Sequence, residues 1–265
     1  MPNPFSLLSS IRNWHELIIA FGLVNLKQRY KQRYLRAAWA VINPLLTMAV
    51  FTVVFSKVAG VQSEGAPYPL FAFTAIVPWI FFSSSVGFAV NCLNSNFNLI
   101  TRINFPKITV PLGSILATLF DFMVSSALLA AAFALYGYPV GINALYVIPV
   151  FAVHMMFTIG VCLIVSILNV YFRDIQSAMP ILLQVWMLAS PVGYPVGMVD
   201  KSLLPYYFLN PMSGILDGYR KALLHNQAPD PVSITIATVI SVAVFVAGYY
   251  IFKASEKNIA DIIAP

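Results

Sequence analysis

The stretch Lys27-Gln-Arg-Tyr-Lys-Gln-Arg-Tyr-Leu-Arg36 stands immediately before the first long apolar run of the chain. It holds five of the fifteen Lys and Arg residues in the protein. Basic residues beside the first hydrophobic segment resist translocation and stay on the cytoplasmic side of a membrane. The stretch therefore predicts that residues 1–36 are cytoplasmic and that the chain enters a membrane at residue 37.

The composition excludes a water-soluble domain. Hydrophobic residues make up 60% and charged residues 9% of the 265 residues, whereas about 25% of an average soluble protein is charged. This length accommodates about six spans of roughly 20 residues, so we expect one integral membrane domain over residues 1–265. The net charge of +6 lies mainly in the predicted cytoplasmic segments, and we expect no nucleic-acid partner. Cys92 and Cys162 predict neither a disulfide framework nor a metal site.

The apolar runs predict an all-α membrane protein with six transmembrane helices. Eleven of the fifteen Lys and Arg residues fall in the cytoplasmic segments of this topology and four in the external segments. The excess of positive charge on one side places both termini, including the tail 253–265, in the cytoplasm. The predicted spans of the bundle 37–252 are 37–56, 68–90, 110–136, 144–170, 175–194 and 232–252.

Before the basic stretch, Trp14, Leu17, Ile18 and Phe21 recur at helical spacing. This pattern predicts an amphipathic helix that lies at the cytoplasmic membrane surface. Two interpretations stay open at this point, a plain membrane anchor and a helix that also docks a partner.

The external segment 195–231 contains Asn210-Pro211, a capping residue followed by proline at the first helical position. A helix from there to residue 225 is too short to span the membrane, and the charges of Asp217, Arg220 and Lys221 oppose full burial. We expect Asp217 to pair with Arg220 and Lys221. The segment predicts re-entrant external helices, with an ordinary exposed loop as the alternative.

Within the third predicted span, Ser114, Thr118, Asp121 and Ser125 form one polar face. A carboxylate near mid-depth should lie in the bundle interior and be hydrogen-bonded or protonated. Asp121 is then either a substrate or proton contact or an interhelical contact, and the second interpretation is favoured because no other span contains an acid. His154, alone in the fourth span, is interpreted as a packed, hydrogen-bonded histidine.

The internal loop 91–109 is the one sizeable cytoplasmic connection between spans. Phe105-Pro106 requires an extended backbone there, and Arg102 and Lys107 surround the aromatic ring with positive charge. An aromatic anchor among charges is typical of a docking site. The alternative is a phenylalanine that dips into lipid.

Signatures of catalysis are missing from the sequence. None of the thirteen glycines is followed by lysine, so the chain has no phosphate-binding G-x-x-x-x-G-K-[ST] loop. It also lacks an H-E-x-x-H motif, and its nine acids are scattered. A membrane-embedded transferase that acts on a lipid carrier, the alternative from another class, would need clustered acids for metal and phosphate chemistry. We therefore expect a channel or transporter subunit that is no enzyme and binds no cofactor or metal itself.

Four short motifs occur in a fixed order along nearly the whole chain. They are Arg29-Tyr-Lys31 with Leu35, Trp39 and Asn43-Pro44; Asn104-Phe-Pro-Lys107 with Pro111; Tyr171-Phe-Arg-Asp174; and Ser190-Pro-Val-Gly-Tyr-Pro195 with Leu209-Asn-Pro211 and Tyr219-Arg220. In this order the chain resembles the permease subunits of type-two ABC exporters of bacterial polysaccharides, the group for O-antigen, capsule and teichoic acid. It departs from that pattern at Arg36, where the family usually has glycine.

The resemblance implies a channel-forming homodimer bound to two copies of a separate ABC ATPase subunit, which would hold ATP and Mg. The expected activity is ATP-driven movement of lipid-linked O-antigen or a similar polysaccharide from the cytoplasmic to the external face of the bacterial inner membrane. Teichoic acid, drugs and small lipids are the alternative cargoes within the same family.

The resemblance also implies roles for particular residues. The residues expected to couple to the ATPase are Arg102, Asn104, Phe105, Pro106, Lys107, Arg173 and Asp174. Those expected at the external exit are Tyr194, Pro195, Asn210, Pro211 and Arg220.

Aromatic residues supply a physical complement, because the C–H faces of sugar rings stack on aromatic rings. The predicted channel lining consists of Trp39, Phe51, Phe55, Trp79, Phe82, Trp186 and Tyr194, together with Asp121. For each aromatic ring, contact with lipid or packing in the core is the alternative.

On a helical wheel the basic stretch has two faces. Arg29, Arg33 and Arg36 share one face, and Tyr30 and Tyr34 share the next. We predict that this surface receives the pyrophosphate and first sugars of the substrate at the cytoplasmic entrance, with binding of lipid headgroups as the alternative.

Overall fold

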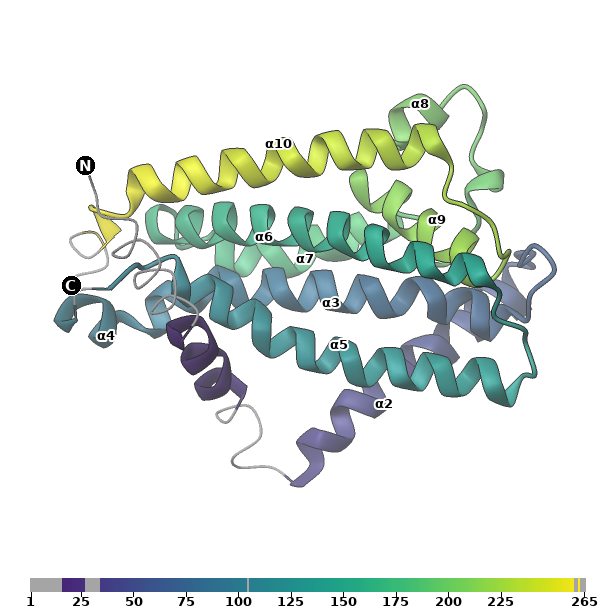
Figure 1. The fold of residues 1–265 in the computed structure, drawn as a ribbon, viewed down its shortest axis with the longest axis horizontal. Helices are drawn as coiled ribbons and strands as arrows, with labels where there is room; N and C mark the ends of the chain where they lie inside the picture. Colours follow the sequence, from purple (N-terminus) through teal and green to yellow (C-terminus); the bar gives the residue numbers. More distant parts are fainter. Residues whose placement is uncertain (1–15, 27–33, 104, 260–261, 263–265) are drawn as a thin grey trace.

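A computed structural model of the protein describes residues 16–26, 34–103, 105–259 and 262, with the backbone alone for residues 34–39. Every regular element in these residues is helical, which confirms the predicted class (Figure 1). A helix at Glu16–Leu26 precedes α2 (Tyr34–Phe51), α3 (Tyr68–Ser95), α4 (Phe97–Arg102), α5 (Thr109–Leu135), α6 (Val147–Tyr171), α7 (Ile175–Leu188), α8 (Leu204–Tyr207), α9 (Pro211–Leu223) and α10 (Pro231–Ser255). The π-helix η1 (Thr52–Val58) continues α2, and the 3-10 helices η2 (Ile142–Tyr146) and η3 (Val196–Met198) precede α6 and α8.

Five helices among the described residues are long and apolar enough to cross a membrane. They are Ala40–Val58, Tyr68–Ser95, Thr109–Leu135, Ile142–Tyr171 and Pro231–Ser255. All five correspond to predicted spans, so the chain is a multi-pass membrane protein.

The helix predicted over residues 175–194 ends instead at Leu188. Its 14 residues extend about 21 Å at 1.5 Å per residue, less than the roughly 30 Å of a bilayer core. Ser190 precedes Pro191, and the residue before proline is disfavoured in a helix. The chain turns at residues 189–195, a segment that we name the exit turn because the predicted exit residues Tyr194 and Pro195 belong to it.

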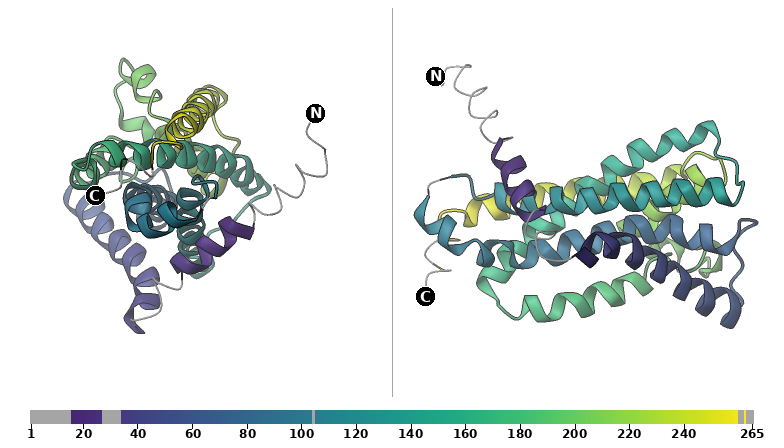
Figure 2. Two further views of the ribbon diagram at one scale, coloured as in Figure 1. Left: turned by 90° about the vertical axis from the view of Figure 1, so that its left-hand side faces the viewer. Right: turned by 90° about the horizontal axis from the view of Figure 1, so that it is seen from below.

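α3 lies at the centre of the bundle, in contact with α2, α5, α6, α7 and α9 (Figure 2). In its most hydrophobic window 72% of residues are buried, against 22% in α10 and 11% in the first span. A helix that is apolar on all sides is covered either by protein or by lipid. α3 is covered by the protein itself, whereas most residues of the other two helices are left uncovered by the rest of this chain.

Glycines bring two pairs of helices into close contact. A β-carbon on Gly248 of α10 would lie 2.6 Å from the carbonyl oxygen of Gly160 in α6. The helix Glu16–Leu26 packs on α5 in the same way, since a β-carbon on Gly113 would lie 2.5 Å from the β-carbon of Phe21. Small residues at such contacts let backbones approach, which strengthens packing between helices in lipid.

The two ends of the bundle differ in what they carry. α4, the helix Glu16–Leu26 and the last turn of α10 lie at one end, and η2, α9 and the loop before α3 lie at the other (Figure 1). The charge distribution predicts that the first end is cytoplasmic. We name them the cytoplasmic end and the external end.

Candidate functional site

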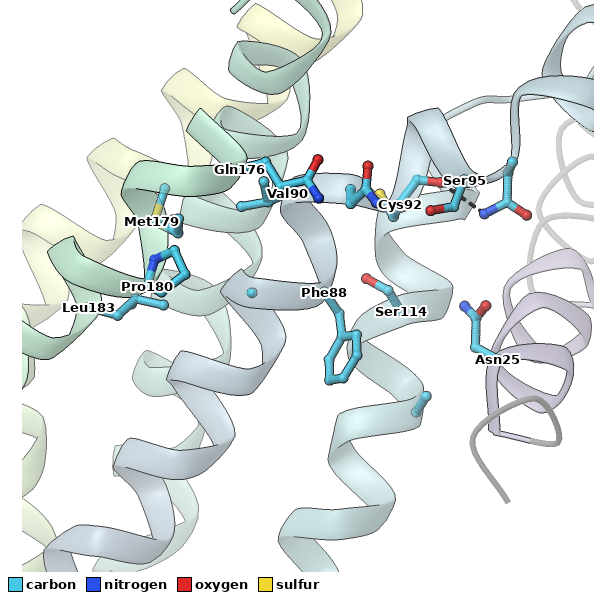
Figure 3. Close-up of a pocket in the computed structure, with 14 residues that line it drawn as sticks. Asn25, Phe88, Val90, Cys92, Ser95, Ser114, Gln176, Met179, Pro180 and Leu183 are labelled. Atoms are coloured by element: carbon cyan, nitrogen blue, oxygen red, sulfur yellow. Dashed lines mark hydrogen bonds between the residues drawn. The ribbon is translucent and has the colours of Figure 1, made fainter. Parts of the chain in front are cut away.

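A cavity of about 660 Å³ lies toward the cytoplasmic end, between α3, α5, α7 and the helix Glu16–Leu26 (Figure 3). Six uncharged side chains with amide or hydroxyl groups line it: Asn25, Asn91, Ser95, Asn96, Ser114 and Gln176. Its apolar lining includes Phe88, Met179, Pro180 and Leu183. None of the described residues that line the cavity is charged.

The chemistry of this lining suits a neutral ligand that is rich in hydroxyl groups. Amide and hydroxyl side chains both donate and accept hydrogen bonds, and the ring of Phe88 offers a face for the C–H side of a sugar. Two of the polar side chains donate hydrogen bonds to backbone carbonyls three or four residues earlier in the chain. Asn96 Nδ2 donates to Cys92 O at 2.8 Å, and Ser114 Oγ donates to Pro111 O at 2.7 Å.

The cytoplasmic loop 103–108, which we name the coupling loop, is packed rather than free. The ring of Phe105 is half-buried, and its centroid lies 5.5 Å from that of Phe21 in the N-terminal helix. The Lys107 backbone N–H donates to Glu256 Oε1 at 2.8 Å, and Lys107 Nζ donates to Glu256 O at 2.9 Å. The predicted docking residues are thus held by both the N-terminal helix and the end of α10.

The other residues predicted to contact an ATPase lie at the same end. Arg102 ends α4, and Arg173 and Asp174 form the turn between α6 and α7; all three are exposed. Asn104 of the predicted coupling set lies outside the described residues, as do Arg29, Tyr30 and Arg33 of the predicted entrance. The side chains of Tyr34, Arg36 and Trp39 are likewise outside the description, so these roles stay predictions.

At the other end, most of the exit turn is buried, and side chains bind three of its consecutive carbonyl groups. Arg220 Nη2 donates to Val192 O at 2.7 Å, and Arg220 Nη1 donates to Tyr194 O at 3.0 Å. Tyr68 Oη donates to the intervening Gly193 O at 2.6 Å. These side chains come from α9 and α3, so the turn is held by helices distant in sequence.

Arg220 itself is buried, with 2% of its surface exposed. Its guanidinium carbon lies 3.7 Å from the ring centroid of Phe71, and burial lowers its pKa to about 10, still a cation at neutral pH. The sequence predicts that Asp217 pairs with both Arg220 and Lys221. In the structure Asp217 binds Lys221 at 3.0 Å, and the described hydrogen bonds of Arg220 go to backbone carbonyls.

The first span reaches the exit turn through two of the predicted lining residues. The rings of Phe51 and Phe55 stack with centroids 5.1 Å apart. A β-carbon on Gly193 would lie 2.9 Å from the ring of Phe55. Phe55 belongs to the π-helix η1, a rare element that often occurs at functional sites.

Other predicted lining residues form the centre of the bundle. Trp79 and Phe82 are buried, and the ring of Phe82 lies 5.1 Å from that of Trp186. Trp186 Nε1 donates to Asn210 Oδ1 at 2.9 Å, and Asn210 Nδ2 donates to Ser190 Oγ at 2.8 Å. The predicted exit residue Asn210 therefore links α9 to α7 and the exit turn. Pro195 and Pro211 of the predicted exit set are buried.

The polar face of α5 points into the bundle. Ser114, Thr118 and Ser125 are buried, and Thr118 Oγ1 lies 2.6 Å from Ser85 Oγ of α3, an interhelical hydrogen bond. Asp121 is half-buried on the same helix. His154 is buried with Nδ1 3.5 Å from Tyr219 Oη, consistent with a packed histidine.

Sequence reasoning missed the cavity, Tyr68 and Glu256. A signal for the cavity is present in the run Asn91-Cys-Leu-Asn-Ser-Asn-Phe-Asn98, an unusual density of amides at the end of an apolar helix. Tyr68 and Glu256 carry no local signal, because their partners are 125 and 149 residues away in the chain.

Comparison with known proteins gives a consistent result over the whole length. The chain matches the family described as ABC-2 type transporter over residues 16–224. It is 29% identical over 261 residues to the O-antigen export system permease protein RfbA of Myxococcus xanthus, covering 97% of this chain and 99% of that protein.

Two further relatives carry related names. The O-antigen export system permease protein RfbA of Klebsiella pneumoniae is 25% identical over 249 residues, 94% of this chain and 95% of the relative. The polysialic acid transport protein KpsM of Escherichia coli is 20% identical over 239 residues, 90% of this chain and 93% of the relative.

Proposed function

Since the chain belongs to the ABC-2 type transporter family, we propose that it is the permease subunit of an ATP-driven exporter of lipid-linked O-antigen or a similar polysaccharide. The observation that carries the proposal is the near full-length similarity to permeases named for O-antigen export. The chain is a transporter subunit rather than an enzyme. The cargo moves from the cytoplasmic to the external face of the bacterial inner membrane.

The proposed working unit is a homodimer of this chain with two copies of a separate ATPase subunit, which bind ATP and Mg. The exposed faces of α2 and α7 supply apolar surface for a second copy or for lipid: Leu46 and Val50, and Ile181 and Val185, are about half exposed or more. The coupling loop, with Arg102, Arg173 and Asp174 beside it, is the surface proposed to meet the ATPase.

Six crossings are part of the proposal. α6 ends at the cytoplasmic end and α10 begins at the external end (Figure 1). The segment between them therefore makes one net crossing, for which α7 and the exit turn provide the length. In this topology α9 dips in from the external side, with its buried face against α3, α6 and α10.

The amide-lined cavity supports a glycan cargo on chemical grounds. A polymer that must slide needs many weak contacts rather than a few strong ones, and neutral hydrogen bonds contribute about 0.5–1.5 kcal/mol each. The cavity lies between the N-terminal helix and α7. We propose that the first sugars pass there after the pyrophosphate meets the basic stretch 27–36.

A deletion tests the proposed function directly. The gene is removed from a host that assembles a lipid-linked glycan on the cytoplasmic face, and surface and intracellular glycan are measured separately. We expect intracellular accumulation and loss from the surface, both reversed by the wild-type gene. Normal surface glycan without accumulation would show that the chain has another cargo or function.

A matched pair of variants tests the cavity. Asn91 lines it, whereas Asn98 of α4 is exposed outside it. Asn91→Ala should lower the export rate about 2- to 10-fold through one lost hydrogen bond. Asn98→Ala should export at the wild-type rate, and equal effects of the two variants would remove the cavity from the proposed path.

A further inference from the structure

The carboxylate of Glu256 connects the end of α10 to the coupling loop. One oxygen accepts from the Lys107 backbone N–H at 2.8 Å, and the other accepts from Lys253 Nζ at 2.8 Å. Its side chain is 16% exposed, whereas that of Lys253 is 55% exposed. The hydrogen bond to the Lys107 N–H is thus partly buried, whereas the ion pair with Lys253 is exposed to solvent.

This contact lies just before the first turn of α5 and binds the backbone of the loop that leads into that helix. The residue before α5, Ile108, makes no side-chain capping hydrogen bond. The first N–H groups of a helix have no intrahelical partner, and negative charge is favourable beside them. Glu256 supplies an acceptor and a negative charge at Lys107, whose carbonyl already accepts from Val110 N–H in the first turn of α5.

Apolar packing joins the same elements. Phe252 of α10 and Ile259 beyond it are fully buried in a cluster that includes Phe21, Ile100 and Val110. The cluster thus contains side chains from α10, the N-terminal helix, α4 and α5. Together with Glu256 it holds these segments as one unit at the cytoplasmic end.

The opposite end of α10 contacts the helix that holds the exit turn. A β-carbon on Gly214 of α9 would lie 2.7 Å from the carbonyl oxygen of Ser233, in the first turn of α10. Between Ser233 and Glu256, α10 contains no proline. Its 25 residues extend about 37 Å, from the coupling loop to α9.

We propose that α10 transmits the displacement of the coupling loop to α9 and the exit turn, with Glu256 as the positioning residue that joins the loop to the helix. The proposal rests on the proposed function for its ATPase partner. When the ATPase subunits close, the coupling loop and the end of α10 move together because Glu256 binds the loop backbone. α9 follows at the other end, and Arg220 carries the motion to the carbonyls of the exit turn.

Three variants separate the acceptor from the charge. Glu256→Gln keeps an oxygen for the Lys107 N–H and removes the charge, whereas Glu256→Ala removes both. Lys253→Gln removes only the exposed ion pair and is the matched control. We expect Glu256→Gln and Lys253→Gln to act like wild type. In Glu256→Ala, movement of the coupling loop should no longer reach the exit turn. Glu256→Asp is a conservative variant for use if Glu256→Ala fails to assemble.

The measurement is made on the full permease–ATPase complex in lipid nanodiscs. A cysteine is placed at Met198, which is 60% exposed just after the exit turn, and the native Cys92 and Cys162 are buried. Its labelling rate is compared with and without ATP. We expect the wild type to change about 5-fold or more, Glu256→Ala to lose that change, and its basal ATP hydrolysis to stay within about twofold of wild type.

A nucleotide-dependent change that survives in Glu256→Ala overturns the proposal, and an equal loss in Glu256→Gln overturns the role of the acceptor. Hydrogen exchange of the permease alone gives an independent readout. The Lys107 amide should lose about tenfold protection in Glu256→Ala but not in Glu256→Gln. A wild-type permease that binds no ATPase would contradict the proposed function, while hydrogen exchange would still decide whether Glu256 holds the loop.

Discussion

The exit turn and the coupling loop are both short irregular segments that a distant helix holds by its side chains. At the exit turn, Arg220 and Tyr68 bind three consecutive carbonyls inside the bundle. At the coupling loop, Glu256 binds one N–H and the Lys107 ammonium binds one carbonyl at a partly exposed surface. The two segments differ mainly in their access to water.

That difference decides how much each contact contributes. A buried carbonyl that loses its donor cannot turn to water and costs about 1–3 kcal/mol. An exposed group that loses its partner is hydrated at little cost, and exposed ion pairs contribute about 0–1 kcal/mol. We infer that the contacts of the exit turn contribute more to stability than the exposed contacts at the cytoplasmic end, and the following changes test that contrast.

The largest effect is expected at Arg220. Arg220→Ala leaves the carbonyls of Val192 and Tyr194 without their described donors, which should destabilise the protein by about 3–6 kcal/mol. Thermal unfolding of the purified protein measures this. Arg220→Lys should recover only part, because an ammonium lacks the planar fork that binds both carbonyls.

Lys221→Ala is the matched control on the same helix. Lys221 is 30% exposed and pairs with Asp217, so its loss should cost at most about 0.5 kcal/mol. A similar loss of stability in Arg220→Ala and Lys221→Ala would mean that any truncation on α9 destabilises the protein. The hydrogen bonds from Arg220 to the carbonyls would then not be the cause.

A smaller effect is expected for Tyr68→Phe, which removes a single donor from Gly193 O and keeps the ring. The expected loss is about 1–2 kcal/mol, read from the same unfolding transition. Tyr250→Phe, at a tyrosine that is 67% exposed, is the control. An unchanged stability in Tyr68→Phe would show that water reaches the exit turn.

Asp230, at the external start of α10, is expected to contribute less stability than Arg220 and more than Lys253. Its carboxylate accepts from Ser233 N–H at 2.8 Å, and this hydrogen bond lowers the pKa of Asp230 below its ordinary 3.8. Asp230→Ala should cost about 1 kcal/mol at neutral pH. Because the folded-state pKa is the lower one, the contribution is complete above the ordinary value and is lost as pH falls through the lowered pKa.

The free energy of unfolding of the wild type and of Asp230→Ala is measured from neutral to acidic pH. The difference in stability between wild type and Asp230→Ala should therefore shrink as pH is lowered below about 4. A difference that is constant from neutral to acidic pH would assign the effect to packing instead of to the charged cap.

The smallest effect is expected for Lys253→Gln at the cytoplasmic end. The ion pair with Glu256 is 2.8 Å long but the lysine is 55% exposed, so we expect a loss of about 0–0.5 kcal/mol that vanishes in high salt. A loss as large as that of Tyr68→Phe would contradict the contrast between the two ends.

The sequence by itself determined the membrane class and most of the spans. The runs 68–90, 110–136, 144–170 and 232–252 became the helices Tyr68–Ser95, Thr109–Leu135, Ile142–Tyr171 and Pro231–Ser255. This succeeds because lipid offers no hydrogen bonds, so an apolar run of sufficient length must satisfy its own backbone as a helix. A type-two ABC permease was also predicted from motif order, and the match over residues 16–224 confirms the ABC-2 type transporter family.

Only the tertiary structure decided where that local rule fails. The chain leaves the helix at Leu188, shortly before Ser190-Pro191, and Arg220 and Tyr68 bind carbonyls of the exit turn that follows. Arg220 was predicted at the exit, yet its burial depends on carbonyls of the exit turn and of α3, which are distant from it in sequence. Glu256 and the amide-lined cavity were missed for the same reason. Each is made by groups far apart in sequence, whose meeting is set by packing rather than by any local pattern.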